Sequence, residues 1–370
     1  MDSGDVILVI VVGTALAFDF TNGFHDTANV VATAISTQAA PPRVAVTAAA
    51  ILNFVGAFIS LAVAATVAKG IVQADLITPT IVFAGLIGAI AWNLATWYFG
   101  LPSSSSHALI GGVVGAAFAA QGPDAVLGDG ILGKVVIPAL VAPVLAFAVA
   151  GIAILVAYRI VGALRPGPIT QGFRFGQLAS GGLLALSHGT NDAQKTMGVI
   201  TLALVAHGDI SPDNFHVPDW VVISAATAIA LGTYIGGWRI IKTMATRIIK
   251  MDSAQGFSAS GAGAVVILAS SHFGFPLSTT HVINGGIMGA GAAKRLSAVR
   301  WGIAGNIAIA WILTLPMAAL IGAAVWGITR IFGTGAAGPV IVSALLLAGL
   351  LLLFARRVQQ GSPITSTGAP

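Results

Sequence analysis

Long hydrophobic stretches alternate with short polar segments along almost the whole chain. Most of these stretches hold about 20 residues, enough for an α-helix to cross the roughly 30 Å hydrocarbon core of a bilayer. The pattern therefore predicts an all-α polytopic membrane protein. The apolar stretches lie near residues 5–38, 44–68, 79–99, 102–120, 131–158, 175–206, 219–240, 258–274, 276–292, 299–329 and 338–355.

Composition supports this class of protein. Of the 370 residues, 56% are hydrophobic and only 8% are charged, whereas soluble domains are about one quarter charged. The net charge of +5 would suit nucleic acid in a soluble protein, but here the excess Lys and Arg mark cytoplasmic loops. We therefore expect a lipid bilayer, not nucleic acid, as the partner. The chain has no cysteine, and Asp2 and Asp5 precede the first apolar run, which argues against a cleaved signal peptide.

Two polar motifs occur twice, in the same order. "LPSSSSHALIGGVVG" (101–115) aligns without gaps on "FPLSTTHVINGGIMG" (275–289), and "NGFHD" (22–26) aligns on "HGTND" (188–192). An apolar composition alone would not repeat Pro, His and Asp together, so the pattern indicates an internal duplication. The coincident pairs include Pro102 with Pro276, Ser104 with Ser278, His107 with His281, Gly23 with Gly189 and Asp26 with Asp192.

The distribution of charge predicts opposite orientations for the two copies. Lys and Arg concentrate at 159–174, 239–250 and 294–300, whereas the loops at 121–130 and 207–219 contain none. Positively charged loops stay in the cytoplasm, so the N-terminus is expected outside. The first apolar run then crosses inward and its repeat crosses outward. Lys69 and Lys134 fall on the expected outer side, as exceptions.

The resulting domain organisation has two repeats of inverted topology, an architecture typical of secondary transporters. The runs 79–120 and 258–292 are expected to be helical hairpins that enter from opposite faces. We expect a first repeat at 1–160, a basic connector at 161–174, an inverted second repeat at 175–330, an additional transmembrane helix at 336–356 and a disordered tail at 357–370.

Polar residues interrupt the first apolar run of each repeat. A helix over 5–38 would be about 50 Å long, longer than the bilayer core, so this run must tilt strongly or break, and "FTNGFHD" (20–26) is the segment where we expect the break. A carboxylate in the membrane costs several kcal/mol unless it is paired or binds a cation. Asp26 and Asp192 are therefore candidate site residues, although polar side chains can also simply join helices by hydrogen bonds.

The "PSSSSH" and "PLSTTH" segments predict helix N-termini inside the membrane, because Pro and Ser/Thr favour the first turn of a helix. Such N-termini bind anions, and two of them could converge on one tetrahedral oxyanion near the midplane; ordinary capping is the alternative. Asp26 beside an anion requires a proton or another cation, which His25 or Asp26 could carry. Lys195 could bind the anion or pair with Asp192.

Four segments resemble the signature stretches of the PiT family of inorganic phosphate transporters: "NGFHDTANVVAT", "LPSSSSHALIGG", "SHGTNDAQKTMG" and "FPLSTTHVINGG". The resemblance covers roughly residues 15 to 310, in the family's order. It implies a multi-pass protein of the cell membrane that takes up inorganic phosphate by symport with a cation, through alternating access. The resemblance implies no cofactor beyond the coupling ion.

The resemblance also implies site residues. For phosphate these are Asp26, Asn29, Ser104, Ser105, Ser106, Asn191, Asp192, Lys195, Ser278, Thr279 and Thr280, and for the coupling ion Asn22, His25, Asp26 and Asp192. His25 before Asp26 resembles the low-affinity bacterial branch, which implies coupling to protons and uptake of phosphate, often as a neutral metal complex. No metal ligand is assigned.

Several alternatives stay open at this point. The same fold could carry sulfate or another oxyanion, couple phosphate to Na⁺, or form a channel. An intramembrane enzyme could use Ser105 with His107, or His25, Asp26, His188 and Asp192 as metal ligands. Catalysis seldom needs the same polar set twice in inverted orientation, so we do not expect an enzyme. The oligomeric state is open, a homo-oligomer included.

Overall fold

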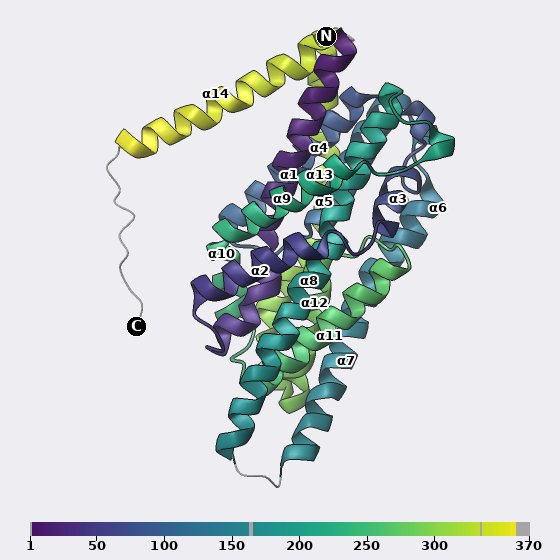
Figure 1. The fold of residues 1–370 in the computed structure, drawn as a ribbon. Coiled ribbons are helices and arrows are strands. Elements are labelled where there is room, and N and C mark those ends of the chain that lie inside the picture. The colour runs from purple at the N-terminus through teal and green to yellow at the C-terminus, as the bar shows by residue number, and fades with distance from the viewer. Residues whose placement is uncertain (1, 163–165, 334, 360–370) are drawn as a thin grey trace.

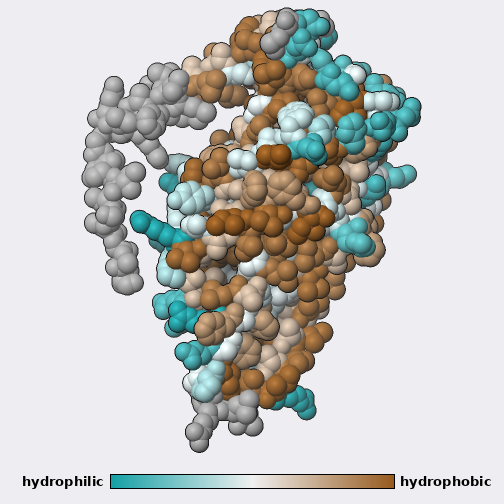
Figure 2. All heavy atoms as spheres, in the orientation of Figure 1, coloured by the Kyte–Doolittle hydropathy of each residue, from teal (hydrophilic) through white to brown (hydrophobic). Residues whose placement is uncertain are grey.

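The structure, a computed structural model, describes residues 2–162, 166–333 and 335–359, and most of these residues are helical. The helices form an elongated bundle (Figure 1). Hydrophobic residues cover most of the face seen in Figure 2, and hydrophilic residues gather mainly near its ends. Within these residues, four helices are long and apolar enough to cross a membrane, or five if one bent pair counts as a single span. The expected all-α polytopic membrane fold is confirmed.

The helices before the midpoint of the chain are α1 (Ser3–Ser36), α2 (Pro42–Gly56), α3 (Ala62–Lys69), α4 (Pro79–Phe99), α5 (Ser105–Gln121), α6 (Gly128–Ile131) and α7 (Ile137–Val161). Those after it are α8 (Pro166–His207), α9 (Asp219–Ile235), α10 (Trp238–Thr246), α11 (Ser253–His272), α12 (Thr279–Lys294), α13 (Trp301–Ile331) and α14 (Ala337–Gln359). A π-helical turn at Leu132–Val136 joins α6 to α7.

The two halves interlock through exchanged packing partners. Helix α5 packs against α13 of the other half, and its sequence counterpart α12 packs against α7. Likewise α1 packs against α9, while α8 packs against α2. Each of these helices thus packs against a helix of the opposite half, and corresponding helices have corresponding partners.

The break expected in the first long helix is wrong. Helix α1 runs unbroken over 34 residues through Gly23, and α8 runs through Gly189. These glycines serve close helix packing instead: a Cβ at Gly23 would lie 2.2 Å from the carbonyl oxygen of Ile229, and one at Gly189 would lie 2.1 Å from that of Asn53. Neighbouring helices surround the polar side chains of α1 and α8. The backbone therefore does not need to unwind beside these side chains, and it stays helical.

The interruptions fall in the second apolar run of each half. The run expected at 44–68 divides into α2 and α3. The run expected at 219–240 divides into α9 and α10, which meet at an angle of 66°. Gly236, with a φ of 74°, lies at this second junction, where a left-handed backbone favours glycine.

Both expected hairpins are present. Helix α4 ends at Gly100, which has a left-handed φ of 66°, and α5 starts a few residues later. Ser104 caps α5 by accepting a hydrogen bond from the backbone N–H of His107 at 3.1 Å. Ser278 caps α12 in the same way, from His281 at 3.3 Å. The two motifs therefore begin helices, as their Pro and Ser/Thr content predicts.

The remaining boundaries differ in part from those expected. Helix α8 starts at Pro166, so most of the connector expected at 161–174 is helical, and its residues 163–165 lie outside the described part of the chain. Helix α14 covers the run expected at 336–356 and leaves the bundle near the N-terminus (Figure 1). Of the tail expected at 357–370, residues 360–370 lie outside the described residues.

Candidate functional site

Polar side chains from four helices meet inside the bundle. They come from the middle of α1, the middle of α8 and the first turns of α5 and α12, and they are almost completely shielded from solvent. This buried cluster comprises His25, Asp26, Asn29, Ser105, Ser106, His188, Asp192, Lys195, Thr279 and Thr280. It joins residues that are far apart in the sequence and belong to both halves.

The carboxylate of Asp26 lies on the α1 side of this cluster. Its Oδ1 is 2.5 Å from Nδ1 of His25 and accepts a hydrogen bond from the Ser105 hydroxyl at 3.1 Å. Its Oδ2 accepts a longer hydrogen bond, 3.5 Å, from the Thr279 hydroxyl. The other imidazole nitrogen of His25 lies 3.2 Å from the hydroxyl of Thr96 on α4. Asp26 is thus joined to both hairpins.

The carboxylate of Asp192 is the corresponding group on α8. Its Oδ1 accepts a hydrogen bond from Nζ of Lys195. Its Oδ2 lies 3.1 Å from Nε2 of His188 and accepts a hydrogen bond from the Thr279 hydroxyl at 3.2 Å. Thr279 therefore contacts both carboxylates, one from each half of the chain.

Lys195 joins the first turns of the two hairpin helices. Besides pairing with Asp192, its Nζ donates to the Ser106 hydroxyl at 2.5 Å and to the carbonyl oxygen of Leu277 at 2.8 Å. Ser106 itself donates to Leu277 at 3.1 Å. Of the two roles expected for Lys195, the structure shows the ion pair with Asp192, with the ammonium group also at the N-terminal end of α5.

The N-termini of α5 and α12 converge in this cluster. Asn29 extends the set by donating to the hydroxyls of Thr280 at 2.9 Å and Thr279 at 3.3 Å. Helix N-termini carry unpaired N–H groups and a partial positive charge, and hydroxyl groups add further donors. Both features attract a tetrahedral oxyanion.

The formal charges of the cluster do not favour an anion by themselves. Asp26 and Asp192 contribute two negative charges and Lys195 one positive charge when both histidines are neutral. In a medium of low dielectric constant this excess repels a second anion. An anion therefore needs an accompanying proton or metal cation to enter the site.

Some residues expected in the site lie at its edge. Asn191 donates to the hydroxyl of Ser271 at 2.8 Å and to the carbonyl oxygen of Phe275 at 3.3 Å, and so connects α8 to the end of α11 and to the turn before α12. Asn22 lies one turn before Asp26, and its Oδ1 has no hydrogen-bond partner within the part of the chain that the structure describes. The hydroxyl oxygens of Ser104 and Ser278 serve as helix caps. These four side chains are near the cluster but do not contact its carboxylates.

The sequence did not indicate all of the residues that contact the buried cluster. His188 appeared only as a possible metal ligand, yet its Nδ1 lies 3.2 Å from Oδ1 of Asn53 on α2, a second buried polar residue. A signal was present, because "NGFHD" and "HGTND" exchange the positions of His and Asn between the halves. Asn53 and Thr96 lie in apolar helices outside the repeated motifs.

Three of these groups could hold a cation. Asp26, His188 and Asp192 each offer one ligand atom, and the three atoms lie within 4.8 Å of one another. Carboxylate oxygens and imidazole nitrogens together suit divalent metal ions. The same place can therefore receive a cation next to the convergent helix N-termini.

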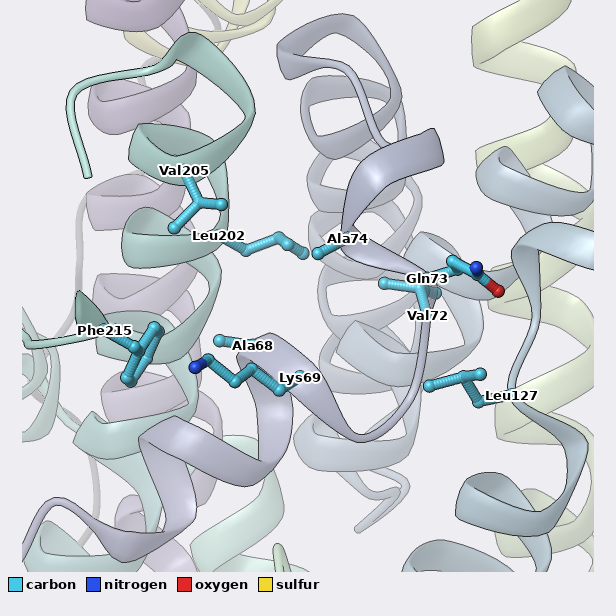
Figure 3. A pocket seen from close by; sticks show the side chains of 9 residues that line it. All are labelled: Ala68, Lys69, Val72, Gln73, Ala74, Leu127, Leu202, Val205 and Phe215. Carbon is cyan, nitrogen blue, oxygen red and sulfur yellow. The ribbon is translucent and has the colours of Figure 1, made fainter. Parts of the chain in front are cut away.

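The cluster is separate from the hollow at the ends of α3 and α8. Figure 3 shows this pocket, with a volume of about 330 Å³ and a mostly apolar lining that includes Leu127, Leu202 and Phe215. Nζ of Lys69 lies 4.8 Å from the centre of the Phe215 ring. The pocket shares no residue with the buried cluster, whose side chains are almost completely shielded from solvent.

An enclosed polar site between two interlocked helical halves defines an integral membrane protein of the transporter class. The model of the phosphate transporter family matches residues 22–322, and the chain belongs to this family. The comparisons thus place it among transporters and not among enzymes.

Named relatives agree with this assignment. A probable low-affinity inorganic phosphate transporter of Mycobacterium bovis is 51% identical over 340 residues, which cover 92% of this chain and 81% of the relative. One from Bacillus subtilis is 43% identical over 325 residues, covering 87% of this chain and 97% of the relative. A solved structure described as the sodium-dependent phosphate transporter matches with a TM-score of 0.79 and 24% identity, over 88% of this chain and 99% of that chain. The last likeness shows the fold.

Proposed function

We propose that the protein takes up inorganic phosphate across the cell membrane by symport with a proton, through alternating access. The observation that carries the proposal is the convergence of two hairpin N-termini on two buried carboxylates that share the Thr279 hydroxyl. The names of the relatives, low-affinity inorganic phosphate transporters, support the choice of substrate.

Hydroxyl and ammonium groups would provide the donors for phosphate. Ser105, Ser106, Thr279 and Thr280 lie at the two helix N-termini, and Lys195 lies between them. Phosphate at neutral pH also carries a proton that it can donate to a carboxylate, and sulfate does not. The carboxylates of Asp26 and Asp192 can accept this hydrogen bond, which favours phosphate over sulfate.

The pair formed by His25 and Asp26 would carry the coupling proton. The imidazole and carboxylate are 2.5 Å apart and buried, so one proton can be shared between them. Its positive charge offsets the negative excess of the cluster and allows the anion to enter. Asn22 and Asp192 complete the set proposed for coupling.

Transport would require the two halves to move against each other. The buried cluster is closed to both sides in this structure, and it lies where elements of residues 1–160 and 175–330 meet. In transporters with inverted repeats, rocking of one half against the other exposes such a site to each face in turn. The exchanged packing of α5, α7, α12 and α13 supports this architecture.

The test is uptake of radiolabelled phosphate into proteoliposomes under an imposed pH or sodium gradient, with unlabelled sulfate as competitor. We expect uptake that an inward proton gradient drives and that sulfate does not reduce. Uptake that requires sodium would retain the site but refute proton coupling. Competition by sulfate would move the protein to the sulfate carriers.

The variants Asp26→Asn and Asp192→Asn should abolish gradient-driven uptake, because each removes a carboxylate that binds the cation and accepts from phosphate. Size-exclusion profiles in detergent should match that of the unmodified protein. Normal transport by both variants would refute the assignment of the site.

A further inference from the structure

A third buried carboxyl group, that of Asp19, lies on α1 outside the cluster described above. It precedes Asp26 by two helical turns, about 10 Å toward the N-terminal end of α1. Its relative exposure is 0%, and neither carboxylate oxygen has a hydrogen-bond partner among the described residues. The proposed transport cycle gives this group no role.

The surroundings of Asp19 are polar but contain no available counter-ion. The Thr196 hydroxyl and the Asn22 amide are its polar neighbours, and each has an oxygen atom that finds no hydrogen-bond partner in the described ranges of the chain. The charged groups that face Asp19 are Asp192 and Lys195 of α8, and these two are already paired with each other.

Helices α4 and α9, which also pack against α1, add no charged group to the two that act on Asp19. Helix α4 carries one titratable side chain, Tyr98, and α9 carries Asp219 and Tyr234; all three stand at or next to helix ends. A bare carboxylate in such surroundings costs several kcal/mol. One proton removes that charge without further ligands, whereas a metal cation needs several coordinating oxygens.

Asp19 has no counterpart in the second half. The alignment of Gly23 on Gly189 places Ala185 at the equivalent position, and Ala185 is also buried. The duplicated helix N-termini that would bind phosphate therefore do not need this carboxyl group. A carboxyl group that is present in one half alone suits a step that occurs once per transport cycle, such as the binding of one proton.

We propose that Asp19, flanked by Asn22 and Thr196, is a second proton-binding site on the path between the N-terminal side of the membrane and the His25–Asp26 pair. The inference rests on the proposed proton symport. An O–H bond forms when a carboxylate oxygen of Asp19 takes up the proton. This bond breaks when the proton passes on toward the His25–Asp26 pair, where an N–H or O–H bond forms in its place.

The variant Asp19→Asn tests this role, because the amide imitates the protonated acid and cannot release a proton. Proteoliposomes allow two measurements: accumulation of phosphate driven by an inward proton gradient, and exchange of labelled for unlabelled phosphate without a gradient. We expect Asp19→Asn to lose accumulation and to keep exchange at the wild-type rate. Asp19→Glu should restore accumulation, and the exposed Asp124→Asn serves as a control that keeps both activities.

The outcomes separate this inference from the function on which it rests. If the unmodified protein neither exchanges nor accumulates phosphate, the proposed function fails. If it does both and Asp19→Asn accumulates phosphate normally, only the role of Asp19 is refuted. Loss of exchange in Asp19→Asn that Asp19→Glu does not restore would assign Asp19 to packing and also overturn the inference.

Discussion

The hydroxyl group of Thr279 lies between the two buried carboxylates of the site. It comes from the first turn of α12 and contacts Asp192 at 3.2 Å and Asp26 at 3.5 Å. A hydroxyl has one proton to donate, so it cannot satisfy both carboxylates fully. A substrate oxygen or a proton placed between them would complete the hydrogen bonds that Thr279 leaves weak.

Replacement of this hydroxyl should weaken phosphate binding. We expect Thr279→Ala to raise the apparent KM for phosphate about tenfold, since hydrogen bonds to charged groups contribute about 1.5 to 3 kcal/mol. Thr279→Ser keeps the hydroxyl and should stay near the unmodified value. Concentration-dependent uptake in proteoliposomes measures both, and an unchanged KM in Thr279→Ala would limit this residue to the structure of the helix start.

Glycine contacts determine how the helices cross. Gly23 of α1 approaches α9, and Gly189 of α8 approaches α2; the reverse contacts are made by Gly232 against Phe20 and Gly56 against Leu186. Each contact places a backbone carbonyl where a Cβ would be. Small residues let membrane helices approach closely, and this approach brings the polar faces of α1 and α8 into the centre of the bundle.

A methyl group at one crossing should therefore destabilise the protein. Gly23→Ala would place Cβ 2.2 Å from the Ile229 carbonyl oxygen, and we expect a loss of about 1 to 3 kcal/mol of folding stability from overpacking. Gly13→Ala on the same helix is the matched control, since a Cβ there meets nothing within 4 Å. Thermal unfolding in detergent compares the two, and equal melting temperatures would contradict the crossing.

At the scale of the whole molecule, the loops between helices differ in charge. The segment around α10 carries Arg239, Lys242 and Arg247, whereas the loop at 207–219 carries no Lys or Arg. The positive-inside tendency assigns the former to the cytoplasm and the latter to the outside. With this orientation α1 and α8 cross in opposite directions, as two inverted halves require.

Single cysteines can test this orientation because the chain has none of its own. Asn214 and Thr246 are both exposed. Asn214 lies in the loop without Lys or Arg, and Thr246 lies in the basic segment around α10. In intact cells a membrane-impermeant maleimide should label Asn214→Cys directly and Thr246→Cys only after permeabilisation. The opposite pattern would reverse the orientation, and labelling of both in intact cells would refute the inverted halves.

The sequence alone predicts much of this protein. Apolar runs of membrane-spanning length establish the class, because the energy of a helix in a bilayer depends on its own residues. The repeated motifs identify Asp26 and Asp192, and their Pro and Ser/Thr content identifies the starts of α5 and α12. The length of an apolar run and the residues that start a helix are local signals, and the repeat is found by comparing two segments of the sequence, so none of these signals requires knowledge of the packing.

The tertiary structure decides the rest. Gly23 looked like a helix break in the sequence, but its role depends on Ile229, about 200 residues away, and only packing brings the two together. The same holds for the contacts of Thr279 with Asp26 and of Lys195 with Ser106. Which polar groups meet, and which buried carboxyl group such as Asp19 stays unpaired, follows from how both halves pack, since the burial of a charge is a property of its surroundings and not of its own residue.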